Sequence, residues 1–476
     1  MINKVLKTPL VAHLSKWIAP DAIEIPAKFV IVYLLMDTLD KSTFGVLSIA
    51  MLIFSYHSLA QFGVVDWLVY ELPKKYSRSE DMNTLVHGSA SFSFINQALI
   101  SVILILLIIL LNSDSLLIFA CAVYLVQSLF YSIYLHQSLI LRYQYKFNFV
   151  LNLRIVFSVT RFFLELMSLV FFDIYVFLLV EAFIFLIPII FLKLSNNSQI
   201  KFSLTKEKYI DFFKKGFPFF IVVCLAIALA SIDRWVVIFT NGTAVFATYS
   251  VAHVIISAAL IIPGKLLSIF TQYLREIFTH RSCLASNISC NMSVNSLLIG
   301  FLVLILIIVQ IGLEFMIFNY IPKYIDVILI ISPLLLMAIL LFSGSLIKNT
   351  LYLLEKRKTV YKIQLASLLL YIVFLFYADG GIIEIIWAMN YMLIFQFSVS
   401  TLTVVFNNKK LDFDIEIVRY LSITAISVSY FIFSQLYGDY NIVLLHAMVF
   451  VLLYIYRNKV MVVNIRYLST REFDIG

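Results

Sequence analysis

Long apolar runs separated by short polar segments make up most of this chain of 476 residues. About fourteen of these runs hold roughly 20 residues each, the length at which an α-helix crosses a hydrocarbon core of ~30 Å. We expect transmembrane helices centred near residues 27, 55, 98, 127, 161, 183, 228, 257, 302, 336, 369, 393, 427 and 448. The pattern therefore predicts an all-α polytopic membrane protein.

Lysine and arginine gather in every second gap between the apolar runs, whereas the other gaps are mostly acidic. Because short cytoplasmic loops accumulate basic residues, we expect both termini in the cytoplasm. This arrangement also accounts for the net charge of +8, so nucleic acid is not indicated as a partner. The basic gaps contain Lys74, Lys75, Arg142, Lys146, Lys214, Arg275, Lys356 and Lys409.

Composition supports the membrane assignment and narrows the chemistry. The chain is 62% hydrophobic and 13% charged, which excludes an ordinary soluble globular protein. The segment with His280, Cys283 and Cys290 does not have the ligand spacing of a zinc site. The Gly264-Lys265 pair lacks the rest of a phosphate-binding loop. We therefore predict no metal, no cofactor and no enzymatic activity.

A polar interval from Ser195 to Lys215 divides the first spans into two groups of about six. The segment Phe44–Ala50 is similar to Phe246–Ala252, and both open a span at equivalent places in the two groups. We expect two parallel six-helix bundles around a central cavity, because an even number of spans leaves both repeats in the same orientation. The expected domains are residues 1–200, residues 201–410, which begin with an amphipathic connector on the inner leaflet, and residues 411–476, with two further helices and a short tail.

The fifth span carries the most concentrated set of polar residues. Arg154, Ser158, Arg161 and Glu165 fall on one helical face. An arginine near the bilayer centre costs roughly 2.5 to 3.5 kcal/mol on insertion scales, so this face is expected to contact protein or water. Two interpretations remain open for Arg161, which are binding of a ligand and pairing with Glu165 for packing alone.

Other spans contain further charged residues. Glu24 and Lys28 form an i,i+4 pair in the first span. Asp233 and Arg234 are adjacent and therefore point about 100° apart, so at least one of them is expected to reach another helix. Glu181 and His253 are candidates for proton coupling or for satisfied core positions. Cations inside the spans exceed their obvious local acids, which favours an anionic ligand.

Several short motifs carry a resemblance to a known family. They are Phe44-Gly45, Phe62-Gly63, Gly216-Phe217-Pro218, Ile232-Asp233-Arg234-Trp235, Phe246–Ala252 and Asp379-Gly380-Gly381. Together with the number and orientation of the spans, they resemble polysaccharide flippases of the multidrug/oligosaccharidyl-lipid/polysaccharide exporter superfamily. The chain looks most similar to the O-antigen translocases, the Wzx-type flippases.

This resemblance implies a substrate, a mechanism and a location. The substrate is an undecaprenyl-pyrophosphate-linked oligosaccharide, moved from the cytoplasmic to the periplasmic leaflet of a bacterial inner membrane by alternating access. Membrane lipid, a polysaccharide polymerase and a chain-length regulator are the other expected partners. We predict that Lys28, Arg154, Arg161 and Arg234 bind the pyrophosphate, because cations can replace its hydration. The predicted coupling residues or charge partners are Glu24, Glu165, Glu181 and Asp233.

Two alternatives belong to other functional classes. An ion-coupled multidrug exporter of the same superfamily predicts that acidic residues dominate the cavity. A membrane polysaccharide polymerase or ligase predicts a long outer loop for its active site, and the outer gaps here are short, about fifteen residues or fewer. The excess of cations and the short outer gaps both favour the flippase.

Overall fold

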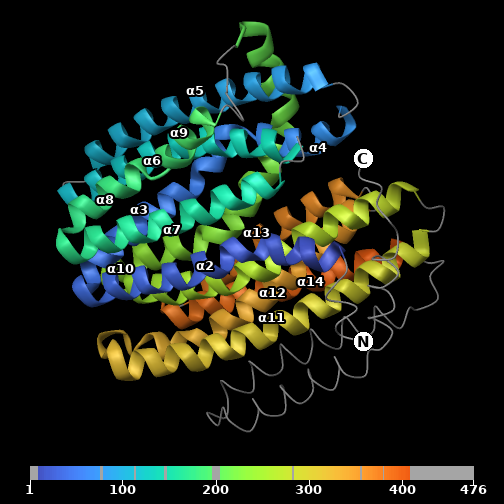
Figure 1. The fold of residues 1–476 in the computed structure, drawn as a ribbon. Coiled ribbons are helices and arrows are strands. Elements are labelled where there is room, and N and C mark those ends of the chain that lie inside the picture. The colour runs from blue at the N-terminus through green and yellow to red at the C-terminus, as the bar shows by residue number, and fades with distance from the viewer. Residues whose placement is uncertain are drawn as a thin grey trace. The chain divides into compact units, whose positions relative to one another are not determined.

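The computed structural model describes residues 9–75, 79–111, 114–143, 147–195, 204–280, 284–353, 356–378 and 380–407 (Figure 1). Within these ranges every regular element is a helix, and helical segments cover each predicted span up to the one centred near residue 393. The all-α fold is therefore confirmed. The two predicted spans in residues 411–476 and the two termini lie outside the described residues.

The chain divides into two compact units, one comprising Ala22–Ile232 and the other comprising Met1–Asp21 with Asp233–Gly476. We call them the N-unit and the C-unit. Their boundaries fall within α2 (Pro9–Thr38) and α10 (Lys206–His280). The other elements of the N-unit are α3 (Lys41–Ser55), the 3-10 helix η1 (Tyr56–Gln61), α4 (Val64–Lys75), α5 (Ser79–Leu111), α6 (Ser115–Tyr143), α7 (Phe147–Phe171), α8 (Ile174–Phe183) and α9 (Leu186–Leu194).

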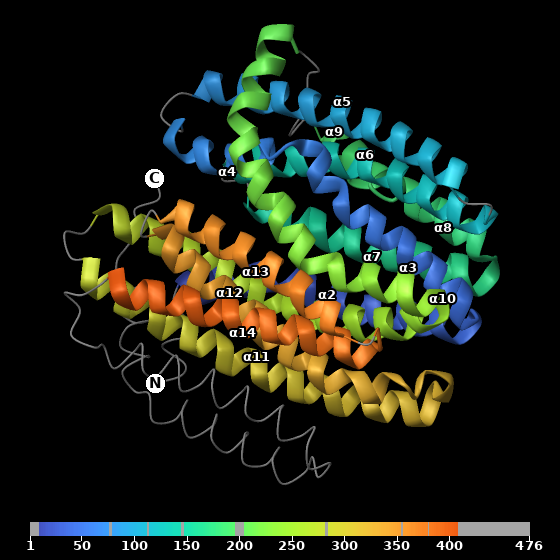
Figure 2. The same ribbon diagram turned by 180° about the vertical axis from the view of Figure 1, so that it is seen from behind.

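Helix α6 occupies the centre of the N-unit, because it contacts α3, α5, α7, α8 and α9 (Figure 2). A hydrophobic core joins α4 to the start of α10 through Trp67, Leu68 and Phe212. A second core packs Val150 and Leu153 of α7 against α6 and α9. These contacts fix α6, α7 and α8 side by side. Four of the charged residues described below lie on α7 and α8, and α6 contributes Gln127.

In the C-unit the elements after α10 are α11 (Leu284–Tyr320), the short 3-10 helix η2 (Pro322–Tyr324), α12 (Val327–Leu353), α13 (Arg357–Tyr377) and α14 (Ile382–Asn407). Helix α12 contacts α11, α13 and α14, and most of its residues are buried. Asn390 of α14 donates a hydrogen bond of 2.9 Å to the carbonyl oxygen of Pro333, which anchors α14 to the middle of α12.

Nine segments within the described residues are long and apolar enough to cross a membrane. Helices α2 and α7 are not among them, because they carry the predicted intramembrane charges. Some spans are interrupted. The sixth span is split into α8 and α9, since Pro188 cannot donate the hydrogen bond that a continuous helix would make to Ile184.

The second part of the predicted connector is helical. Residues from Lys206 onward are the first turns of α10 and continue directly into the seventh span. Helix α10 contains both the seventh and the eighth predicted spans, interrupted by non-helical backbone at Gly242 (φ 80°, ψ 178°).

Candidate functional site

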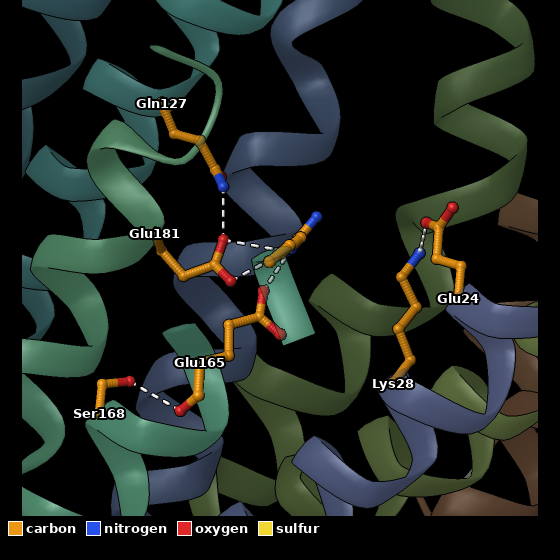
Figure 3. A network of polar contacts seen from close by, with 7 residues as sticks. Glu24, Lys28, Gln127, Glu165, Ser168 and Glu181 are labelled. Carbon is orange, nitrogen blue, oxygen red and sulfur yellow. Dashed lines mark hydrogen bonds and ion pairs between the residues drawn. The ribbon is translucent and has the colours of Figure 1, made fainter. Parts of the chain in front are cut away.

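Arg161 of α7 lies between two buried carboxylates of the N-unit. Its Nε donates to Glu165 one turn further along α7, and its Nη2 lies 2.9 and 3.0 Å from the two carboxylate oxygens of Glu181 in α8. Gln127 of α6 donates a hydrogen bond of 2.5 Å to Glu181 Oε2. Glu165 and Glu181 are 5% and 3% exposed. Figure 3 shows the Glu165, Glu181 and Gln127 side chains converging from three helices.

We call Arg161, Glu165, Glu181 and Gln127 the inner cluster. The charges within it do not cancel. One guanidinium faces two carboxylates, so the cluster carries one negative charge when both acids are ionised and becomes neutral on taking up one proton. A buried ion that loses its partner is strongly destabilising, so Arg161 stabilises the packing of α7 against α8 whatever else it does. Chemically, the cluster can hold a proton or a small cation.

A second cluster in the N-unit, which we call the outer cluster, consists of Glu24, Lys28 and Arg154. Lys28 Nζ lies 2.7 Å from Glu24 Oε1 within α2, and Arg154 Nη2 of α7 lies 3.7 Å from Glu24 Oε2. The Lys28 side chain is 42% exposed, whereas that of Arg154 is 14% exposed. The labelled pair Glu24 and Lys28 stands apart from the Glu165 and Glu181 carboxylates (Figure 3). The exposed ammonium of Lys28 is the group of this cluster that an anion can approach.

In the C-unit, Asp233 and Arg234 bind different partners on the second half of α10. The Tyr249 hydroxyl donates to Asp233 Oδ2. Arg234 Nη2 lies 2.8 Å from Nε2 and 3.2 Å from Nδ1 of His253, whose Nδ1 is also 3.2 Å from the Ser257 hydroxyl. The break at Gly242 makes these contacts geometrically feasible, because it lets the two halves of α10 pack against each other. Both residues therefore reach the eighth predicted span, as was expected of at least one of them.

Arg234 is a cation whose nearest polar partner is an imidazole. Between residues 9 and 407, as far as the structure describes them, no carboxylate lies within ion-pair distance of its guanidinium, and its Nε has no hydrogen-bond partner. A guanidinium has only donors, so the His253 nitrogen that it contacts acts as an acceptor. The Nε of Arg234 is therefore a buried donor without a partner, in a guanidinium that no described carboxylate neutralises.

The structure thus groups six of the eight predicted site residues into the two clusters of the N-unit, and it places Asp233 and Arg234 together in the C-unit. Two partners were not predicted, Gln127 and Tyr249. Neither has a sequence signal, since Gln127 lies 54 residues from Glu181 and Tyr249 lies 16 residues from Asp233. No cluster of His, Cys, Asp and Glu suited to a metal ion occurs in the described ranges.

Comparison with known proteins identifies the fold of this chain. No family model and no curated protein matches the chain. Among solved structures, "Lipid II flippase MurJ, inward closed conformation" aligns with a TM-score of 0.64 and 16% identity, covering 92% of this chain and 97% of that one. This chain has the fold of MOP superfamily transporters.

Two further structures support that statement. An outward-facing multidrug resistance MATE family transporter of the MOP superfamily aligns with a TM-score of 0.55 and 14% identity, covering 89% of this chain and 98% of that one. A MOP superfamily transporter from Pyrococcus furiosus aligns with a TM-score of 0.55 and 13% identity, covering 84% and 97%. The protein is therefore a multi-pass membrane protein with a transporter fold, and the fold alone does not select a cargo.

Proposed function

We propose that this protein is a flippase for an undecaprenyl-pyrophosphate-linked oligosaccharide, an O-antigen or related surface polysaccharide unit. It moves the unit from the cytoplasmic to the periplasmic leaflet of a bacterial inner membrane by alternating access. The observation that carries the proposal is Arg234, an intramembrane guanidinium that contacts a histidine and leaves its Nε without a partner. A cation kept in this state favours an anionic cargo.

The outer cluster of the N-unit supports the same conclusion. Lys28, whose side chain is 42% exposed, and Arg154 both lie near Glu24, and they are the cations that a pyrophosphate would contact there. Charge-assisted hydrogen bonds from arginine to phosphate are among the stronger polar contacts in proteins. In this proposal Arg161 contributes through the inner cluster, where Glu165 and Glu181 act as its charge partners and as candidates for ion coupling. Asp233, which accepts a hydrogen bond from the Tyr249 hydroxyl, is a further candidate for ion coupling.

The fold is shared with a protein named as a lipid II flippase, which agrees with a lipid-linked cargo. A polysaccharide polymerase and a chain-length regulator are the partners that would receive the flipped unit. No catalytic step is required of this chain.

The decisive test is a deletion strain with the glycosyltransferases intact. We expect loss of surface polysaccharide and accumulation of single lipid-linked units that a membrane-impermeant glycosidase cannot reach in spheroplasts. Arg234→Gln should fail to restore the polysaccharide, whereas Lys193→Gln, which removes an exposed lysine at the end of α9, should restore it. Accumulated units that the glycosidase does reach, with short surface chains, would instead indicate a polymerase.

One observation favours a second candidate, the multidrug exporter. The inner cluster has one more acid than base, as a binding site for protons or cationic drugs requires. This candidate predicts that the deletion strain accumulates a cationic dye such as rhodamine 6G and that Glu181→Gln reproduces the defect. Normal dye levels together with lost polysaccharide would exclude it.

A further inference from the structure

Helix α12 has one side that its neighbours in the C-unit leave uncovered. From Ile330 to Leu351 every residue is buried except Leu341, Ser345, Lys348 and Asn349. These four positions have the spacing i, i+4, i+7 and i+8, so they lie on a single helical face. We call them the open stripe of α12. Three of its four residues are polar, although this helix is otherwise the most buried of the apolar spans.

Lys348 has no partner on this stripe. Among the residues that the structure describes, neither Lys348 nor Asn349 makes an ion pair, a side-chain hydrogen bond or a ring contact. This distinguishes Lys348 from Lys28, Arg154 and Arg161, which all lie near carboxylates. Lys348 lies five residues before Leu353, the last residue of α12. Its backbone is therefore about 7.5 Å from that end of the helix, measured along the axis.

Gly344, one turn before this lysine, is buried but leaves space beside its Cα. In an α-helix each side chain leans toward the N-terminus, so the stem of Lys348 lies over Gly344. A methyl group built on Gly344 would meet no atom within 4 Å. Ser345 does not supply a donor, because its hydroxyl already bonds the Leu341 carbonyl at 2.8 Å. The donor on the side of this space is therefore the Lys348 ammonium, and Asn349 is its neighbour on the open stripe.

We propose that Lys348, above the space at Gly344, binds the phosphate of a polyprenyl pyrophosphate headgroup together with the neighbouring Asn349. An ammonium with no carboxylate partner requires an anion, and an adjacent amide adds a hydrogen bond to a phosphate oxygen. The predicted topology places the loop after α12 in the cytoplasm, where the cargo is made. This site therefore acts during loading. The inference rests on the proposed function and adds a binding residue that the sequence analysis did not select.

The test is binding of a short-chain polyprenyl pyrophosphate to the purified full-length protein in phosphatidylcholine nanodiscs. Lys348→Gln should weaken the affinity about tenfold or more, the effect of losing one hydrogen bond to a charged group. Lys348→Arg keeps the charge and should bind within a few-fold of the unmodified protein. Gly344→Leu should also weaken binding, because it fills the space and leaves the lysine in place. Lys193→Gln is the matched control and should bind normally.

Two competition arms identify the source of the phosphate. Inorganic pyrophosphate should displace the probe from the unmodified protein and should compete less well in Lys348→Gln. Nanodiscs with phosphatidylglycerol should leave the probe affinity nearly unchanged. An effect of Lys348→Gln confined to phosphatidylglycerol binding would show a lysine that only reaches the bilayer surface, and it would overturn the inference.

Failure of this inference differs from failure of the proposed function. If Lys348→Gln binds the probe normally while Arg234→Gln does not, the site at Lys348 is wrong and the flippase proposal stands. If the unmodified protein does not bind the probe, both are wrong. If Lys348→Gln does not fold, Gly344→Leu decides, because normal binding by that variant would overturn the inference.

Discussion

Arg161 stabilises the N-unit because it holds two acids that could not otherwise be buried together. Its guanidinium contacts Glu165 in its own helix and both oxygens of Glu181 in the next. Removing one partner of a buried ion pair leaves a charge without compensation and costs about 3 to 5 kcal/mol. A transport defect in an Arg161 variant therefore has to be separated from a folding defect.

We predict that Arg161→Gln lowers the stability of the purified protein, by about 3 kcal/mol in the free energy of unfolding, because two carboxylates then lose their cation. The measurement is thermal unfolding in detergent. The double variant Arg161→Gln with Glu165→Gln should recover part of the loss, since one of the stranded acids is gone. An Arg161→Gln protein that melts at the temperature of the unmodified protein contradicts this prediction.

Contacts within one helix could be predicted from the sequence, and contacts between helices could not. Glu24 with Lys28 and Arg161 with Glu165 are i,i+4 pairs, which the helical period reveals directly. The contact between Arg161 and Glu181 depends on how α7 packs against α8, and no spacing encodes that. Lys348 was missed for a different reason, since a lysine close to a basic loop is easily read as part of the topology signal.

At the scale of elements, the turn between η1 and α4 depends on a close approach of two backbones. Gly63 has φ +68°, and a Cβ there would lie 2.4 Å from the Phe220 nitrogen and 2.6 Å from the Gly216 oxygen of α10. Both neighbours are backbone atoms, so neither can move aside alone. The Phe62-Gly63 and Gly216-Phe217-Pro218 motifs thus meet in the N-unit. Their glycines allow the two backbones to approach each other this closely.

We predict that Gly63→Ala destabilises the protein by about 1 to 3 kcal/mol or more, through the positive φ and the backbone clash together. Thermal unfolding of the purified variant measures this. Gly312→Ala in α11 is the matched control, because a Cβ there meets nothing within 4 Å and alanine favours a helix over glycine. Equal melting temperatures for the two variants would contradict the prediction.

The start of α3 supplies a pH-dependent element outside the spans. Asp40 is its N-cap and accepts hydrogen bonds from the Thr43 hydroxyl at 2.5 Å and from the backbone nitrogens of Ser42 and Thr43 at 3.0 and 3.1 Å. These hydrogen bonds, that of the Thr43 hydroxyl first, lower the pKa of the Asp40 carboxyl below its usual value near 3.8. The ionised form is therefore favoured in the folded protein.

A lowered pKa means that the stabilisation is complete above the unfolded pKa and is lost as the pH falls through the folded pKa. We predict that Asp40→Ala costs about 1 kcal/mol at pH 7 and that this difference shrinks below about pH 4. Asp40→Asn keeps the cap without a titrating group, so its stability advantage over Asp40→Ala should not depend on pH. Melting temperatures from pH 3 to 7 test both statements, and a constant difference between Asp40→Ala and the unmodified protein would contradict them.

The helical elements themselves could be predicted from hydrophobic runs because a span needs about 20 apolar residues whatever packs against it. The breaks within these helices depend on single residues and could not be predicted from the hydrophobic runs. Pro188 splits one span into α8 and α9, and Gly242 joins two spans into one broken helix. Run length averages over such residues, which explains why the positions of the helical segments up to residue 407 could be predicted and their breaks could not.

At the scale of the whole molecule, the N-unit carries as many cations as acids in its two clusters, and the inner cluster has one more acid than base. In the proposed mechanism these fixed charges stay with the protein during alternating access, whereas the cargo pyrophosphate crosses the membrane. The net charge moved is therefore that of the cargo together with any coupled ion.

Outward movement of about two negative charges across 100 mV, negative inside, is favourable by roughly 4.6 kcal/mol. We predict that flipping in proteoliposomes responds to membrane potential in this direction. A potassium gradient with valinomycin sets the potential, and a membrane-impermeant glycosidase reports how much cargo has crossed. At 100 mV the equilibrium ratio of cargo between leaflets should shift about a thousandfold or more toward the positive side.

A control distinguishes transport driven by the membrane potential from transport driven by proton exchange. A pH gradient at zero potential should leave the distribution near its starting value in the unmodified protein if the cargo charge alone drives transport. The variant Glu181→Gln, which removes one acid of the inner cluster, should then keep the full response to potential. A response to the pH gradient that disappears in Glu181→Gln would assign the driving force to proton exchange at the inner cluster, because the proton taken up there neutralises its excess negative charge.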